Sequence, residues 1–292
     1  MRVLVTGGDG QLGTELVLAF TGHEVVAPER SAFDLTSRDS VLQCVTTVAP
    51  DVVVHAAAWT DVDGCEQDPD RAVLVNALGT RHVVEGARIV GARVVYVSTD
   101  YVFPGDGSRP YTEWDATAPL SVYGRSKLGG ERELDPGSTI VRTSWVCGRT
   151  GANFVKTMLR AASAPPADGL AVVDDQHGSP TFADDLAGMI AQLVVARLTG
   201  TFHVTNQGHT TWCGFARDIL AAAGLDPGIV RPIATAELRP ARPAPRPTWS
   251  VLDNAALRLS GIPLLPHYRE SLERLVAALP GSRPAAAAPA AP

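Results

Sequence analysis

Two residues four positions apart, Tyr123 and Lys127, have the types and the spacing of an acid–base pair. Positions i and i+4 share one face of a helix, so the lysine ammonium could approach the phenol. A free tyrosine has a pKa of about 10 and is a poor acid–base at neutral pH. A nearby positive charge favours the phenolate and lowers that pKa. By itself the pair is a weak signal, because a surface tyrosine beside a surface lysine has the same spacing.

A hydroxyl-bearing strand end precedes this pair. The apolar run 93–97 leads into Ser98, Thr99 and Asp100, so these side chains are expected at the carboxyl edge of a sheet. Ligands bind at that edge in open α/β folds.

A glycine-rich turn near the start of the chain supplies the third signal. Residues 6–13 (TGGDGQLG) place Gly7, Gly10 and Gly13 between a predicted strand and a predicted helix. Glycine lets such a turn stay tight and lets the backbone approach a pyrophosphate, which the helix N-terminus then meets. Glycine turns also close ordinary βα connections, but this position favours dinucleotide binding. The turn, the strand end and the Tyr–Lys pair together make chance a poor explanation.

The second predicted strand ends in Glu29 and Arg30, which favour different cofactors. A carboxylate there would hold the ribose diol of NADH, and an arginine would meet the 2′-phosphate of NADPH. Arg30 makes NADPH the expected cofactor, with NADH also accepted. The alternative for Arg30 is a solvated surface charge.

The order of the predicted elements indicates the fold class. Short apolar runs separated by helical stretches are typical of a parallel sheet covered on both faces, a doubly wound Rossmann fold. Strands are expected at 3–6, 24–27, 51–55, 93–98, 139–146 and 200–205, and helices at 11–20, 71–91 and 153–162, with a further helix opened by a capping box at 181–184.

The pattern becomes less regular after about residue 147, which predicts two parts. Residues 1–147 are expected to form the dinucleotide-binding domain, with segments near 170–205 returning to it. Residues 148–280 are expected to form mainly a smaller, C-terminal substrate-binding domain. Residues 281–292 are rich in Ala and Pro and are expected to be a disordered tail.

The charge and composition of the chain argue against several classes of binding partner. The net charge of −6 argues against nucleic acid and gives no basic face for a membrane. No apolar run reaches the roughly 18 residues of a membrane span. The four cysteines lack metal spacing, so reduced and mostly buried thiols are expected. These features predict a cytoplasmic protein, monomeric or homodimeric, without a metal.

A proline-rich loop, residues 239–247, concentrates positive charge in this acidic chain. It carries Arg239, Arg242 and Arg246. An anionic substrate would need such a local feature, and guanidinium groups suit phosphate oxygens. We expect Arg242 or Arg246 to meet a substrate diphosphate. The alternative is a solvated loop whose arginines only keep it soluble.

The chain resembles the extended short-chain dehydrogenase/reductases, and within them most closely the dTDP-4-dehydrorhamnose reductase family. The likeness extends to about residue 275, and the combination of STDYVFPG with RTSWV is specific. The matching stretches are residues 6–13, 51–66, 75–80, 97–105, 119–131, 141–146, 153–159 and 173–181.

The resemblance implies roles for individual residues. Tyr123 would donate a proton to a sugar C4 carbonyl, Lys127 would hold the nicotinamide ribose, and Thr99 would bind the reacting oxygen. Asp100 and Trp145 would also contact the substrate sugar. The cofactor would be held by Gly7, Gly10, Gln11, Leu12 and Gly13 at the pyrophosphate, Asp34 and Leu35 at the adenine, and Ala57, Ala58 and Trp59 along the ribose and nicotinamide side. Asn76 resembles a helix asparagine that supports the proton relay, or is an ordinary polar helix residue.

Three functions compete. The first is NAD(P)H-dependent reduction of a dTDP-4-keto-6-deoxyhexose, most simply dTDP-4-dehydro-L-rhamnose. The second is another nucleotide-sugar enzyme of this class: a 4-epimerase stays open, whereas a 4,6-dehydratase would need an acid where Tyr101 stands. The third is a non-catalytic relative, like the regulatory subunit of methionine adenosyltransferase. The presence of Thr99, Tyr123 and Lys127 favours an enzyme.

Several other ionisable residues are expected to have structural rather than catalytic or metal-binding roles. His55 lies in a Val-rich strand and is expected to be a hydrogen-bonded core histidine. Asp61, Asp63 and Glu66 cluster without metal-ligand spacing. Glu15 matches a position that joins a metal-bridged dimer in some family members, but the acidic ending that would complete the bridge is missing here.

Overall fold

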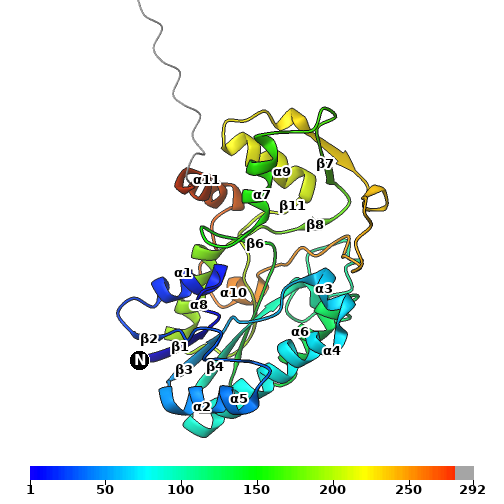
Figure 1. The fold of residues 1–292 in the computed structure, drawn as a ribbon. Helices are drawn as coiled ribbons and strands as arrows, with labels where there is room; N and C mark the ends of the chain where they lie inside the picture. Colours follow the sequence, from blue (N-terminus) through cyan, green and yellow to red (C-terminus); the bar gives the residue numbers. More distant parts are fainter. Residues whose placement is uncertain (280–292) are drawn as a thin grey trace, which may run out of the picture.

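The computed structural model describes residues 1–279 and has a parallel sheet covered by helices on both faces (Figure 1). Its six strands lie in the order β10-β5-β4-β3-β1-β2, and every neighbouring pair is parallel. Their bounds are β1 Arg2–Thr6, β2 Glu24–Val26, β3 Val52–His55, β4 Arg93–Thr99, β5 Thr139–Thr143 and β10 Gly200–His203. The predicted doubly wound Rossmann class is confirmed.

The two faces of the sheet form two separate cores because side chains alternate along a strand. Val3 and Val5 of β1 pack into a cluster with α1 and α8, whereas Leu4 packs on the other face with α2 and α5. Residues 52–54 of β3 divide in the same way. Strands buried on both faces need apolar residues at every position, which is why these runs show no polar alternation.

The helices of this part cover the sheet or lead into the site. Their bounds are α1 Gln11–Ala19, α2 Arg38–Val48, α3 Val62–Gln67, α4 Pro69–Val73, α5 Gly79–Val90, α6 Val122–Glu131, α8 Ala183–Val195 and α10 Ala255–Leu259. The helix predicted at 71–91 is α4 and α5 joined by a π-helical turn, η1 Leu74–Leu78. A short 3₁₀ turn, η2 Asp100–Val102, follows β4.

The strand order reverses beside β1, and this reversal positions the site. In the sheet, β2 lies on one side of β1 and β3 lies on the other. The connections that follow β1 and β3 therefore begin at neighbouring strand ends and lead to helices on opposite faces of the sheet. A crevice at such a point is where doubly wound folds bind ligands. Here a Cβ on Gly7, after β1, would come within 3.0 Å of Ala57, after β3.

A second, smaller core lies beyond the carboxyl edge of the sheet, in the upper part of Figure 1. It contains α7 Phe154–Ala162, α9 Trp212–Ala222 and α11 Tyr268–Ala278, around residues such as Phe182, Phe215 and Tyr268. The short strands and turns here are β6 Val146–Cys147, β7 Leu170–Val173, β8 His177–Gly178, β9 Thr181–Phe182, β11 Thr210–Thr211, β12 Val230–Ile233, η3 Pro227–Ile229 and η4 Thr235–Glu237. Between these segments, α8 and β10 pack with the large sheet, whereas β7 pairs with β12.

Two local predictions are wrong. The strand expected at 139–146 ends at Thr143, because the backbone of Trp145 has φ +47° and turns the chain towards β6 and β9. The helix at 181–184 forms without the expected capping box. Its N-cap is Phe182, which has no side-chain acceptor, and the Phe182 N–H donates instead to the Asn206 side chain at 2.9 Å. The predicted tail at 281–292 lies outside the described residues.

Candidate active site

Tyr123 and Lys127 both lie on α6, as the spacing predicts. Ser121 begins this helix, since its hydroxyl accepts a hydrogen bond from the Gly124 N–H at 3.1 Å. Both side chains are buried, and the Lys127 Nζ donates to the Val97 carbonyl at 2.7 Å. The ammonium also lies 4.1 Å from the centre of the Tyr96 ring, a cation–π contact. Lys127 is thus held against the end of β4.

Burial sets the ionisation of both groups. It raises the pKa of Tyr123 above its usual value, an effect that the Thr99 hydroxyl partly offsets by hydrogen bonding to it. Burial lowers the pKa of Lys127 to about 7, against an opposing contribution from Glu131. The pKa of Tyr123 is therefore raised rather than lowered in the protein alone, because burial disfavours the tyrosinate. A phenol that stays protonated is suited to donating a proton.

Thr99 and Asp100 stand at the carboxyl end of β4, beside Tyr123. The Thr99 hydroxyl donates to Asp100 Oδ1 at 3.0 Å and accepts from the Tyr101 N–H at 3.2 Å. Asp100 Oδ2 is buried without a close hydrogen-bond partner among the described residues, and the Ser250 hydroxyl lies near enough to the carboxyl to influence its pKa. Burial raises the pKa of Asp100 to about 6. Thr99 and Asp100 thus place polar groups next to the phenol.

The turn after β1 fits the pyrophosphate of a dinucleotide. Gly7 has φ +71°, and a Cβ on Gly13 would lie only 1.9 Å from the Gly7 carbonyl oxygen, so a side chain is excluded at Gly13. Helix α1 begins at Gln11 with Gly10 as its N-cap and no side-chain acceptor. The N–H groups of its first turn, including that of Leu12, are consequently left for an anion.

A chain of hydrogen bonds joins the loop after β3 to the Tyr123 helix. Asn76, in the π-helical turn, accepts from the Trp59 N–H at 2.8 Å and donates to the Trp59 carbonyl at 3.0 Å. It also donates to Ser126 at 2.9 Å, and Ser126 donates to the Tyr123 carbonyl at 2.8 Å. Asn76 therefore fixes the segment of Ala57, Ala58 and Trp59 relative to α6. Sequence reasoning missed Ser126, which lies within the Tyr–Lys spacing.

The segment after β2 carries the residues expected near adenine. Asp34 is exposed and accepts from both the N–H and the hydroxyl of Thr36, at 2.9 and 2.7 Å. Leu35 is buried beside Gly79. Arg30 is exposed and lies close enough to Asp34 to help lower the pKa of that carboxyl.

A buried ion pair that the sequence did not reveal lies behind Lys127. Glu131, one turn further along α6, binds Arg142 of β5 through two hydrogen bonds of 2.9 and 2.7 Å. The Ser98 hydroxyl donates to the same carboxylate at 2.6 Å. Both charged side chains are less than a tenth exposed. Separating such a pair would leave unpaired buried charges, which is costly. The Glu131–Arg142 pair therefore holds α6 against β4 and β5.

Trp145 lies at the junction of the two cores, and its ring is held from both sides. It stacks on Trp212 with the ring centres 3.6 Å apart. A Cβ on Gly178 would lie within 2.4 Å of its indole, so Gly178 permits the close approach. This packing fixes the orientation of the indole beside the carboxyl edge of the sheet.

The proline-rich loop crosses to the Rossmann part and meets Asp63 of α3. Arg246 donates to both oxygens of Asp63, at 3.0 and 2.8 Å, and Arg242 donates to one of them at 3.1 Å. Arg239 instead donates to the Ala236 and Leu238 carbonyls of its own segment. Sequence reasoning noted Asp63 only as part of an acidic cluster.

The other ionisable residues have structural partners. His55 is buried between Thr6 and Thr80, at 2.8 and 3.2 Å, and burial lowers its pKa to about 3, so the prediction of a core histidine is confirmed. Asp61 accepts from the Gly64 N–H and Glu66 from the Val122 N–H. Glu15 pairs with Arg149 at 2.9 and 3.0 Å.

Residues 1–279 show no metal cluster, disulfide or membrane-spanning helix. No group of three or more His, Cys, Asp and Glu side chains is placed there to hold a metal. All four cysteines are unpaired and three are buried, as predicted. None of the described helices is long and apolar enough to span a membrane.

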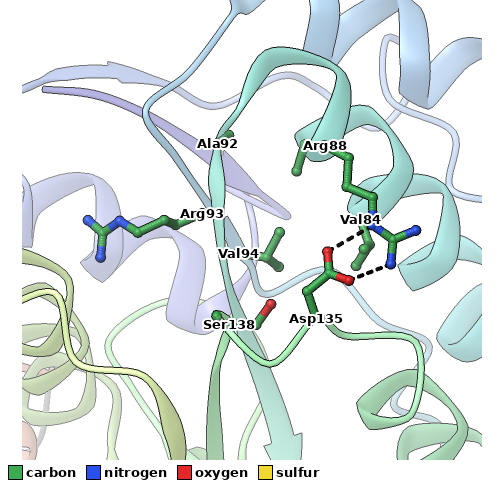
Figure 2. A pocket seen from close by; sticks show the side chains of 9 residues that line it. Val84, Arg88, Ala92, Arg93, Val94, Asp135 and Ser138 are labelled. Atoms are coloured by element: carbon green, nitrogen blue, oxygen red, sulfur yellow. Dashed lines mark hydrogen bonds and ion pairs between the residues drawn. The ribbon is translucent and has the colours of Figure 1, made fainter.

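The pocket in Figure 2 lies away from this site. It is lined by residues such as Val84, Arg88, Arg93 and Asp135, with Arg88 and Asp135 joined by two hydrogen bonds of 2.8 and 2.6 Å. Arg93 begins β4 and Thr99 ends it, so the pocket and the site are about 20 Å apart along the strand.

Groups that can donate a proton and groups that can cradle a dinucleotide thus meet at one edge of a parallel sheet. This arrangement is typical of the extended short-chain dehydrogenase/reductases, and the chain is an oxidoreductase of that class. Residues 1–280 match the family model described as the RmlD substrate binding domain. The chain belongs to the dTDP-4-dehydrorhamnose reductase family.

Individual relatives agree with this assignment. The chain is 44% identical to a dTDP-4-dehydrorhamnose reductase of Streptomyces griseus, over 96% of this chain and 94% of the relative. It is 40% identical to a dTDP-4-keto-6-deoxy-D-glucose reductase of Streptomyces niveus, over 93% and 95%. A crystal structure of a Bacillus anthracis dTDP-4-dehydrorhamnose reductase in complex with NADP is similar, with a TM-score of 0.89, 39% identity and coverage of 94% and 98%.

Proposed function

We propose that this protein reduces the C4 keto group of a dTDP-4-keto-6-deoxyhexose, most simply dTDP-4-dehydro-L-rhamnose, with NADPH as the reductant. The observation that carries the proposal is the meeting of Thr99, Tyr123 and Lys127 at the carboxyl end of β4, in a chain so similar to reductases of this substrate class. The protein would act in the cytoplasm, as a monomer or a homodimer.

The roles of the side chains follow from their environment. When NADPH is bound it supplies the hydride for the C4 carbon. Tyr123 donates its proton to the C4 oxygen, and its raised pKa keeps that proton in place until negative charge develops there. Thr99, whose hydroxyl donates to Asp100 in this structure, would turn it to the same oxygen. Lys127 would hold the nicotinamide ribose, while Asp100 and Trp145 would contact the sugar.

The cofactor would be held by backbone and side chains already in place. The glycine turn (Gly7, Gly10 and Gly13) and the first turn of α1 (Gln11 and Leu12) would bind the pyrophosphate. The Gln11 side-chain amide is held by the Val146 carbonyl and the Asn153 side chain, at 2.9 and 2.7 Å, so its backbone N–H is the group offered to the anion. Asp34 and Leu35 would flank the adenine, and residues 57–59 would run along the ribose and nicotinamide.

Arg30 should determine the preference for NADPH over NADH. It is exposed after β2 and has room to meet a 2′-phosphate. We expect Arg30→Ala to lower the NADPH/NADH ratio of kcat/KM about tenfold or more, because one charge-assisted hydrogen bond is lost. Steady-state kinetics with both cofactors measures this ratio. An unchanged ratio would mean that Arg30 is only a solvated charge.

Arg242 or Arg246 should bind the diphosphate of the substrate. Replacing the arginine that binds it with alanine should raise KM for the nucleotide sugar tens-fold, which corresponds to a loss of about 2 kcal/mol. The Kd of NADPH should stay the same. Arg231→Ala is a suitable control, since Arg231 is an exposed arginine of β12 with one weak partner, Asp168 at 3.4 Å. If both alanine variants keep the wild-type KM, other residues bind the diphosphate.

A single assay distinguishes the three candidate functions. Purified protein is mixed with NADPH and a dTDP-4-keto-6-deoxyhexose, and cofactor oxidation is followed against sugar consumed. A reductase oxidises one NADPH for each sugar. A 4-epimerase changes the sugar without net oxidation, and a non-catalytic regulatory subunit does neither, so either of these results would contradict the proposal.

A further inference from the structure

An ion cluster joins the proline-rich loop to the Rossmann part, and its members differ in role. The Asp63 carboxylate receives four hydrogen bonds, two from Arg246, one from Arg242 and one from the Ala244 N–H at 3.2 Å. We infer that Asp63 is a positioning residue that anchors the loop through Arg246, so that Arg242 is presented to the substrate diphosphate. This inference rests on the proposed function.

The contacts make Arg246 the anchor. Its guanidinium binds both carboxylate oxygens of Asp63 at 3.0 and 2.8 Å, a two-point geometry that fixes orientation as well as distance. Its side chain is only 16% exposed, and that of Asp63 is 20% exposed. The pair is thus shielded from the water that weakens surface ion pairs.

Arg242 is left with donors to spare. It makes a single bond of 3.1 Å to Asp63, and its side chain is 57% exposed. Within residues 1–279, its guanidinium has no other hydrogen-bond partner, so most of its five N–H donors face solvent. These spare N–H donors of Arg242 suit the oxygens of an anion.

The loop cannot hold this position by itself. Its prolines lack N–H donors, and residues 239–247 form no helix or strand. Ala244 is not a proline and has a backbone N–H, which donates to Asp63. At the end of the loop, Pro247 packs on Gly105, and Thr248 donates to the Gly105 carbonyl at 2.9 Å. Asp63 therefore fixes the part of the loop that carries the arginines.

The cluster lies beside the catalytic tyrosine. Asp63, Arg242 and Arg246 are all close enough to Tyr101 to influence its pKa. The Tyr101 ring in turn packs edge-on against Tyr123, with the ring centres 5.6 Å apart. A diphosphate held by Arg242 would thus lie near Tyr101, whose ring contacts the tyrosine that would act on the sugar.

The test replaces Asp63 with a side chain of the same shape. Asp63→Asn removes the charge that holds Arg246, and we expect the Kd of dTDP, measured by calorimetry, to rise about tenfold or more. Thymidine, which lacks phosphates, should bind with unchanged affinity, and so should NADPH. Asp135→Asn is the matched control, because it removes the carboxylate of another two-point Arg–Asp pair, at the opposite edge of the sheet (Figure 2).

A double-mutant cycle separates positioning from general stability. If Asp63 acts through Arg242, then Arg242→Ala should weaken dTDP binding in the wild type and have little further effect in Asp63→Asn. Additive losses would overturn the inference, and so would unchanged or tighter dTDP binding by Asp63→Asn. If Asp63→Asn fails to fold, the same cycle is run with Arg246→Lys, which keeps the charge but loses the two-point contact.

The outcomes also separate this inference from the function on which it rests. Wild-type protein that reduces the dTDP-sugar while Asp63→Asn binds dTDP normally would refute only the role of Asp63. Wild-type protein that neither binds dTDP nor reduces the sugar would count against the proposed function itself.

Discussion

Tyr123→Phe is expected to lower kcat by about 10²–10⁴-fold while leaving the Kd of NADPH within a few-fold of the wild-type value. The substitution removes only the hydroxyl that carries the proton. The ring stays packed against Tyr101, and Phe cannot create a new buried polar group. Single-turnover reduction of the dTDP-sugar measures the chemical step, and fluorescence titration measures cofactor binding.

The control is Tyr268→Phe in α11. It also removes a hydroxyl from a buried tyrosine, one that donates to Asp218 in the smaller core, and should keep full turnover. More than about a tenth of wild-type activity in Tyr123→Phe would remove Tyr123 from its role as proton donor.

Lys127→Ala is expected to impair both catalysis and cofactor binding. Lys127 is the group that would hold the nicotinamide ribose, and its ammonium is fixed by the Val97 carbonyl at the end of β4. We expect kcat to fall by at least about 10²-fold and the Kd of NADPH to rise tenfold or more. Lys127→Met, which keeps the length of the side chain, should behave in the same way. An unchanged cofactor Kd in both variants would contradict the ribose role.

The ionisation of Lys127 gives a second readout for this prediction. Burial lowers its pKa to about 7 in the free protein, so the charged form is present below that pH and is lost above it. The pH dependence of kcat/KM reports ionisations of the free enzyme. Hence kcat/KM for NADPH should fall as the pH rises through about 7 in the wild type, and this ionisation should be missing from Lys127→Met.

Features encoded over short stretches of sequence were predictable. The glycine turn, the alternation of Val-rich strands with helices, and the placement of Tyr123 and Lys127 on one helix all follow from local spacing. Helix α2 had a local signal that was not used: Ser37 is its N-cap and accepts from the Ser40 N–H at 3.3 Å, with Asp39 in the first turn.

Features that depend on residues far apart in the chain were not predictable in this way. Asp63 and Arg246 are 183 positions apart, and only the folded chain brings the loop to α3. The Glu131–Arg142 pair needs the packing of α6 on β5. The end of β5 depends on the positive φ of Trp145. Tryptophan does not favour a positive φ, so the sequence gives no sign of it. The pKa of Tyr123 likewise follows from burial rather than from its spacing to Lys127.

Transfer of a labelled hydride tests the central claim most directly. The protein is given NADPH that carries deuterium at the transferable C4 position of the nicotinamide, together with a dTDP-4-keto-6-deoxyhexose, and the sugar is examined by NMR. The account predicts one deuterium at C4 of the sugar for each NADPH oxidised, and loss of this transfer in Tyr123→Phe. A sugar without deuterium at C4, or one altered at another carbon while the C4 ketone persists, would contradict it.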